Sequence, residues 1–243
     1  MNVLHLNVFR PKAATRPLRP YRPRITCVHL LSRPQDEREV RSVADVGSLH
    51  KHGGISVVKI VNPPYDGLVP APRHAHDRPF SLTPRHYGAW LAHKDAITRH
   101  LVNVDGLLVC ECDCVFCHPV ERMVKLIHRA LEACQRGNLT AFTLGFRHDG
   151  KTIDRIGEDV IVIDQFVCCH CYLIPLAARE VWLRMLAKPW DTFDYCTTVY
   201  LCDQWKCRIG AFADRPAAVQ ADGYSICAER VSTSERHYRS VRN

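Results

Sequence analysis

The segment from Asp105 to Phe116 constrains the fold of this chain more than any other. Its apolar run, residues 107–109, leads into two acids, Glu111 and Asp113, that are separated by one residue. If a β-strand continues through them, both carboxylates point to the same face, because side chains alternate along a strand. Open α/β sheets place ligand-binding groups at the carboxyl ends of their strands. The pattern favours a site for Mg²⁺ or Mn²⁺ carrying a diphosphate over two solvated surface acids.

Length and charge predict one domain with basic and polar ends. The chain has 243 residues and a formal net charge of +8, and residues 1–24 hold six basic residues and no acid. The remainder is nearly neutral, which argues against a nucleic-acid footprint over the whole protein. We predict a disordered Pro/Arg-rich tail at 1–24, a folded domain at 25–228 and a C-terminal tail at 229–243.

The cysteine content and the apolar segments indicate the compartment. Residues 1–9 are apolar, but the charges follow them, whereas a secretory signal places its charges first. The longest apolar stretch, residues 160–178, contains polar side chains and predicts core elements, with no transmembrane segment. Thirteen cysteines without a signal favour free, buried thiols over a disulfide framework. We expect a cytoplasmic protein whose basic tail is able to touch an anionic membrane surface.

Hydrophobic periodicity predicts alternating strands and helices. We expect strands at 25–31, 55–61, 107–112, 139–146 and 160–167. We expect helices at 34–46, from Thr83-Pro84 to about 100, at 120–135 and at 176–186, with a Pro/His-rich loop at 62–79. This alternation is typical of a layered α/β domain with a mostly parallel sheet.

Cysteine-rich segments suggest two other kinds of site. Cys114 to His118 matches the c-type haem attachment pattern C-x-x-C-H, which is short and recurs by chance in such a chain. The cysteines and histidines of 110–118 and 168–171 offer zinc ligands. On a regular strand, Cys110, Cys112 and Cys114 would spread over about 13 Å and could not share one ion unless the strand breaks. The chain lacks a Walker A loop, a G-x-S-x-G elbow and a G-x-G-x-x-G loop.

Six segments in order resemble glycosyltransferase family 25, which includes lipopolysaccharide-type transferases and the collagen galactosyltransferases. The first strand and its basic turn resemble the opening of that family, and residues 82–94 resemble its "L-T-x-G-x-x-G-C-x-x-S-H" helix. Residues 108–114 resemble its "E-D-D" segment, with Cys112 in place of the middle acid. The other three segments resemble "G-T-x-A-Y-L-I", "P-V-D" and the closing strand, and they lie at residues 169–174, 189–191 and 219–225.

The resemblance implies a single GT-A-like nucleotide-diphospho-sugar transferase domain that acts with inversion. Asp113 would bind Mn²⁺ or Mg²⁺, and Glu111 would bind the metal, directly or through water, or the donor ribose. Asp191 is the candidate base and Asp194 the second candidate. The other implied donor contacts are Ser32, Arg33, Arg38, His93 and His170. The implied partners are a nucleotide-sugar donor, with UDP-sugars favoured, and a glycan, lipid-linked or protein acceptor.

Structural roles compete with these functional roles. His93 and His170 are compatible with buried, hydrogen-bonded packing, and Asp191 with a turn or helix cap after Pro189. Cys112 also admits a catalytically weakened sugar-nucleotide-binding module. A third class is a zinc- or nucleic-acid-binding protein that uses the Cys/His clusters and the basic tail.

Overall fold

A computed structural model describes most of the chain between residues 22 and 220. The described residues are 22–31, 37–61, 84–145, 151–166, 169–187, 192–214 and 216–220, and the side chains of 37, 38, 85 and 220 are not described. The predicted tails at 1–24 and 229–243 therefore lie almost entirely outside the described residues, and so does the predicted loop at 62–79.

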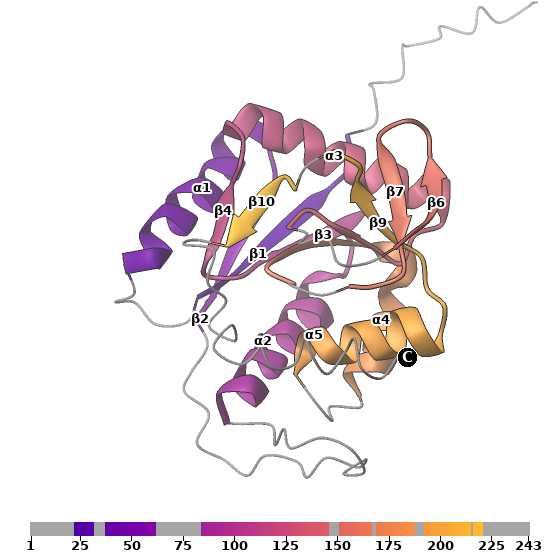
Figure 1. The fold of residues 1–243 in the computed structure, drawn as a ribbon. Coiled ribbons are helices and arrows are strands. Elements are labelled where there is room, and N and C mark those ends of the chain that lie inside the picture. Colours follow the sequence, from indigo (N-terminus) through magenta and orange to yellow (C-terminus); the bar gives the residue numbers. More distant parts are fainter. Residues whose placement is uncertain are drawn as a thin grey trace, which may run out of the picture.

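One eight-stranded sheet forms the centre of the described structure (Figure 1). Its strand order is β2-β1-β3-β8-β5-β9-β7-β6, and every strand except β8 and β7 runs in the same direction. The strands are β1 (Ile25–Leu31), β2 (Ser56–Val61), β3 (Gly106–Cys110), β5 (Ala141–Thr143), β6 (Thr152–Ile156), β7 (Val160–Ile163), β8 (Cys171–Pro175) and β9 (Ile209–Phe212). Outside this sheet, β4 (Cys114–Phe116) pairs antiparallel with β10 (Ala218–Gln220).

Helices cover both faces of the sheet (Figure 1). On one face lie α1 (Glu37–Gly53) and α3 (Val120–Gly137). On the other lie α2 (Pro84–His100), α4 (Arg179–Leu186) after a 3-10 turn (Leu176–Ala178), and α5 (Phe193–Cys196), which continues as a π-helix (Thr197–Gln204). This arrangement confirms the predicted α/β class and the mostly parallel sheet.

Strand alternation divides the core into two layers. Leu107, Val109 and Tyr172 pack toward α2, α4 and α5, where the Tyr172 and Trp182 rings stack 5.5 Å apart. Leu108 and Leu173 point the other way, toward α1 and α3. Successive residues of β3 therefore contribute to opposite layers, which is expected of a strand that is buried on both faces.

The hydrophobic pattern of the sequence predicted most of the helices and strands but misplaced several of their ends. The first strand and the helix from Pro84 to His100 have the predicted limits, whereas the helix predicted at 34–46 runs on to Gly53. It ends there because Gly54 adopts a left-handed backbone with φ +63°. The strands predicted at 139–146 and 160–167 are shorter, and β6, β8, β9 and α5 were not predicted as elements.

The strand predicted at 107–112 ends at Cys110. The backbone N–H of Cys114 donates to the carbonyl of Glu111 over 3.0 Å, which closes a turn at Cys112 and Asp113. A new strand, β4, begins at Cys114 and pairs with a segment about a hundred residues later. The prediction of a continuous strand through both acids was therefore wrong, and the turn sets the direction of Asp113.

Candidate functional site

The acidic turn, residues 111–113, lies at the carboxyl end of β3, between the parallel strand β1 and the antiparallel strand β8. Glu111 continues the alternation of Leu107 and Val109, so its side chain enters the α2 layer. Asp113 is 5% exposed. Both acids lie at the carboxyl ends of the parallel strands, which is where open α/β proteins bind their ligands.

A hydrogen-bonded chain connects Glu111 to helix α2 and strand β8. The Nε2 atom of His93 lies 3.0 Å from Oε1 of Glu111, and its Nδ1 atom lies 2.8 Å from the Tyr172 hydroxyl. A carboxylate only accepts hydrogen bonds, so Nε2–H donates to ionised Glu111 and the Tyr172 hydroxyl donates to Nδ1. Glu111 keeps 29% of its side chain exposed, whereas His93 keeps 1%. Of these three hydrogen-bonded residues, Glu111 is thus the one that a ligand can reach.

Burial sets the protonation states of His93 and Glu111. Desolvation lowers the pKa of His93 to about 4, although the nearby Asp194 opposes this effect. Desolvation raises the pKa of Glu111 to about 7. His93 is therefore neutral at neutral pH, so its contact with Glu111 is a hydrogen bond to a neutral ring. Glu111 exchanges its proton near neutrality, as acid–base groups of enzymes commonly do.

Helix α5 brings a second carboxylate to the same place. The Phe193 ring stacks on the imidazole of His93, with centroids 3.9 Å apart and planes 7° apart. The next residue, Asp194, accepts a hydrogen bond from the backbone N–H of Cys169 over 3.2 Å. Burial raises the pKa of Asp194, and the negative charge of Glu111 raises it further. The site therefore holds two carboxylates whose negative charges repel each other, beside a neutral imidazole.

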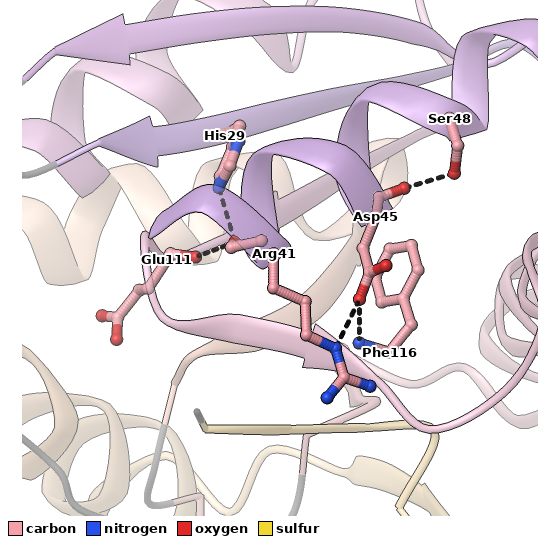
Figure 2. A network of polar contacts seen from close by, with 7 residues as sticks. His29, Arg41, Asp45, Ser48, Glu111 and Phe116 are labelled. Atoms are coloured by element: carbon pink, nitrogen blue, oxygen red, sulfur yellow. Dashed lines mark hydrogen bonds and ion pairs between the residues drawn. The ribbon is translucent and has the colours of Figure 1, made fainter. Parts of the chain in front are cut away.

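Helix α1 holds the acidic turn from the other layer (Figure 2). The Ser42 hydroxyl donates to the carbonyl of Glu111 over 3.4 Å and accepts from Nε2 of His29 over 2.9 Å. One turn further along α1, Asp45 accepts from the backbone N–H of Phe116 over 3.0 Å. In Figure 2 the carboxylate of Glu111 points away from these contacts. Helix α1 thus fixes the backbone of the turn and leaves the Glu111 side chain to the opposite layer.

His170 lies directly beside the turn. Its backbone carbonyl accepts a hydrogen bond from the Glu111 N–H over 2.8 Å. Its imidazole is 4% exposed and covers Gly145, where an added Cβ would lie 2.2 Å from Nε2. A side chain at position 145 would therefore displace the ring, which makes Gly145 part of the support of the site.

The structure brings together only some of the residues predicted from the sequence. His93, Glu111, Asp194 and His170 form one connected group, and Asp113 lies in the same turn as Glu111. Ser32, Arg33 and Asp191 lie outside the described residues, and the side chain of Arg38 is not described. Tyr172 and Phe193 were not predicted to take part. The sequence held a signal for Tyr172, which lies in an apolar segment and matches the tyrosine of "G-T-x-A-Y-L-I".

Two surface hollows lie away from this group. One, of about 430 Å³, is lined by α1 and β2 residues, and the other, of about 240 Å³, lies beside Cys202 and Lys206. Neither is lined by Glu111, Asp113, His93 or Asp194. Within the described part of the chain, Cys110, Cys114 and Cys171 are the only three His, Cys, Asp or Glu residues with ligand atoms all within 4.8 Å. Among the described residues, Glu111 and Asp113 therefore belong to no such three-ligand cation site.

Comparison with known proteins supports the fold. No protein-family model and no curated protein matches the sequence. The fold is similar to the crystal structure of a glycosyltransferase involved in the glycosylation of the major capsid of PBCV-1. The TM-score is 0.50 at 15% identity, over 88% of this chain and 100% of that chain. A putative glucose-1-phosphate thymidylyltransferase from Bacillus anthracis, in complex with a sucrose, matches at a TM-score of 0.40 and 11% identity, over 87% and 95%.

The chain therefore has an α/β fold similar to that of this glycosyltransferase, with its acidic turn at the carboxyl end of a central strand. None of the described helices is long and apolar enough to cross a membrane.

Proposed function

We propose that this protein is a glycosyltransferase that moves a sugar from a nucleotide-diphosphate donor to an acceptor hydroxyl with inversion. The observation that carries the proposal is the acidic turn at the end of β3, in a fold similar to that of a glycosyltransferase. Glu111 is both accessible and linked to buried polar groups. The resemblance to glycosyltransferase family 25 agrees with this assignment and favours a UDP-sugar donor with a glycan, lipid-linked or protein acceptor.

The acidic turn suits a divalent cation that is shared with the donor. Mg²⁺ and similar ions are commonly held by one or two carboxylates together with substrate phosphates, so a preformed cage of three protein ligands is not required. Asp113 would hold Mn²⁺ or Mg²⁺, with Glu111 as the second carboxylate. A bound cation offsets the charge that develops on a departing diphosphate.

Direct displacement also requires a base for the acceptor hydroxyl. Asp194 suits this role because burial and the charge of Glu111 both raise its pKa, which makes it a better proton acceptor than an exposed aspartate. Asp191 is the candidate from the resemblance and lies three residues earlier. Transfer and donor hydrolysis by Asp191→Asn and Asp194→Asn separate the two, because loss of the base impairs transfer to the acceptor while donor binding persists.

A donor screen tests the proposed function. Purified protein is incubated with UDP-, GDP- and CMP-sugars and Mn²⁺, and released nucleotide is measured with and without EDTA. We expect one donor class to be hydrolysed and Asp113→Asn to lower turnover by about 10²–10³-fold, as loss of a comparable electrostatic stabiliser does. Glu132→Gln is the matched control, because its carboxylate is 63% exposed on α3 and pairs with Arg136 one turn along the helix surface. Full activity of Asp113→Asn in EDTA would remove the metal-assisted mechanism.

Cys112 favours a second candidate, a sugar-nucleotide-binding module with little turnover. It lies between the two acids, where the "E-D-D" segment of glycosyltransferase family 25 has a third acid. Its side chain is half-buried in the turn. A protein of this kind would bind a nucleotide sugar in calorimetry and release no nucleotide. The same donor panel therefore distinguishes the two functions.

A further inference from the structure

Thiols gather beneath the acidic turn, in the layer opposite His93. Cys110 ends β3, Cys114 begins β4 and Cys171 begins β8, and their three sulfur atoms all lie within 4.8 Å of one another. All three side chains are buried. A fourth thiol belongs to Cys27 on the neighbouring strand β1, and its sulfur lies 3.9 Å from that of Cys110. Four separate strands thus direct cysteines to one place in the core.

Two of the distances between these sulfur atoms match a tetrahedral thiolate site. With Zn–S bonds of about 2.3 Å, two sulfurs of a regular tetrahedron lie about 3.8 Å apart. The Cys110 and Cys171 sulfurs are 3.8 Å apart, and those of Cys27 and Cys110 are 3.9 Å apart. The break in the strand after Cys110 makes this geometry attainable, because the turn folds Cys114 back toward Cys110. Cys110 and Cys114 would be too far apart to share an ion only on an unbroken strand, and here one strand ends at Cys110 and another begins at Cys114.

We propose that Cys110, Cys114 and Cys171 bind a zinc ion and that Cys27 completes the tetrahedron after rotation of its side chain. Thiolates select soft or borderline cations such as zinc over Mg²⁺ and Mn²⁺, so this site is chemically distinct from the acidic turn. It is a closed structural site, because apolar side chains such as Leu108, Phe116 and Leu144 belong to the same buried cluster.

Binding exchanges protons for the metal. Hydrogen bonding to the Cys114 thiol and burial raise the pKa of Cys110, so this side chain is a neutral thiol at neutral pH when no metal is bound. Each coordinating cysteine forms a Zn–S bond and releases its thiol proton to solvent, and no oxidant or reductant takes part. The bound ion would tie β1, β3, β4 and β8 together next to Glu111 and would hold the acidic turn in place. This inference does not depend on the proposed transferase activity.

Metal analysis of the full chain tests the site. Protein purified under reducing conditions is dialysed, its zinc is measured by mass spectrometry, and zinc is then replaced by Co²⁺ as a spectroscopic probe. We expect about one ion per chain and the intense visible bands of tetrahedral cobalt–thiolate coordination. Cys110→Ser should weaken binding at least 10–100-fold, since loss of even an outer-shell partner costs that much. Cys134→Ser and Cys117→Ser are the controls, because Cys134 is a buried thiol that is not among the three mutually close ligands, and Cys117 is exposed.

Three results would overturn the proposal. The first is wild-type protein that holds no zinc and gives no cobalt–thiolate spectrum. The second is Cys110→Ser protein that binds as much metal as Cys134→Ser. The third is a Cys110–Cys171 disulfide in the isolated protein. If Cys110→Ser does not fold, the cobalt spectra of the wild type and of Cys117→Ser decide, because a lost signal in Cys117→Ser would place the ion at the exposed cysteines.

Discussion

Replacing Glu111 by Gln should stabilise the fold at alkaline pH and impair the proposed transfer. Burial raises the pKa of Glu111 from 4.5 to about 7. Below about pH 4.5 the carboxyl is protonated in both the folded and the unfolded chain, so its burial costs nothing extra. Between about pH 4.5 and 7 the unfolded chain loses this proton first, so stability falls as pH rises, and above about pH 7 the full cost is present.

The size of the effect follows from the pKa. One pKa unit corresponds to about 1.4 kcal/mol, so the ionised carboxylate costs the folded state about 3 kcal/mol at most. Since 29% of the side chain is exposed, we expect Glu111→Gln to recover about 1–3 kcal/mol at about pH 8.5 and much less at about pH 5. The glutamine oxygen still accepts from His93 Nε2–H, so the hydrogen bond is kept.

Urea unfolding of wild type and variant at the two pH values measures this difference. Glu132→Gln is the control, because its carboxylate is exposed to solvent on α3 and its replacement relieves no burial. An equal effect of Glu111→Gln at both pH values would refute the reasoning, since it would mean that Glu111 titrates normally. A gain in stability together with a loss of turnover would identify Glu111 as a group kept for function at a cost to the fold.

Three further predictions concern the turn, the core and the tail. Cys112→Asp should be tolerated or should raise turnover in the donor screen, because it adds a third acid to the turn; loss of all donor binding would contradict this. Gly210→Ala should destabilise the fold by about 1–3 kcal/mol in urea unfolding, because its Cβ would lie 2.6 Å from Leu139 and 2.7 Å from Phe142. Gly47→Ala is its control, since nothing lies within 4 Å of the added Cβ, and equal effects of both changes would disprove the crowding. Deleting residues 1–24 should leave the melting temperature within a few degrees, and a large drop would show that the tail packs on the domain.

The sequence predicted the parts of the site that depend on local pattern. The apolar run before Glu111 and the Pro84 helix that carries His93 followed from periodicity and capping, and so did the α/β class. The end of β3 at Cys110 did not, because it depends on the pairing of β4 with β10 about a hundred residues away. The position of Asp194 depends on Phe193 packing against His93, a contact between distant segments with no local signature.

The antiparallel pairing of β3 with β8 has a consequence for how this protein can change in length. Gly106 faces Pro175 and Cys110 faces Cys171, so both strands meet the site edge in a fixed register. One inserted residue in β3 would exchange the layers and send the carboxylate of Glu111 among the thiols and a thiol toward His93. Insertions and deletions among relatives should therefore avoid β3 and β8 and accumulate at surface turns such as 157–159, between β6 and β7.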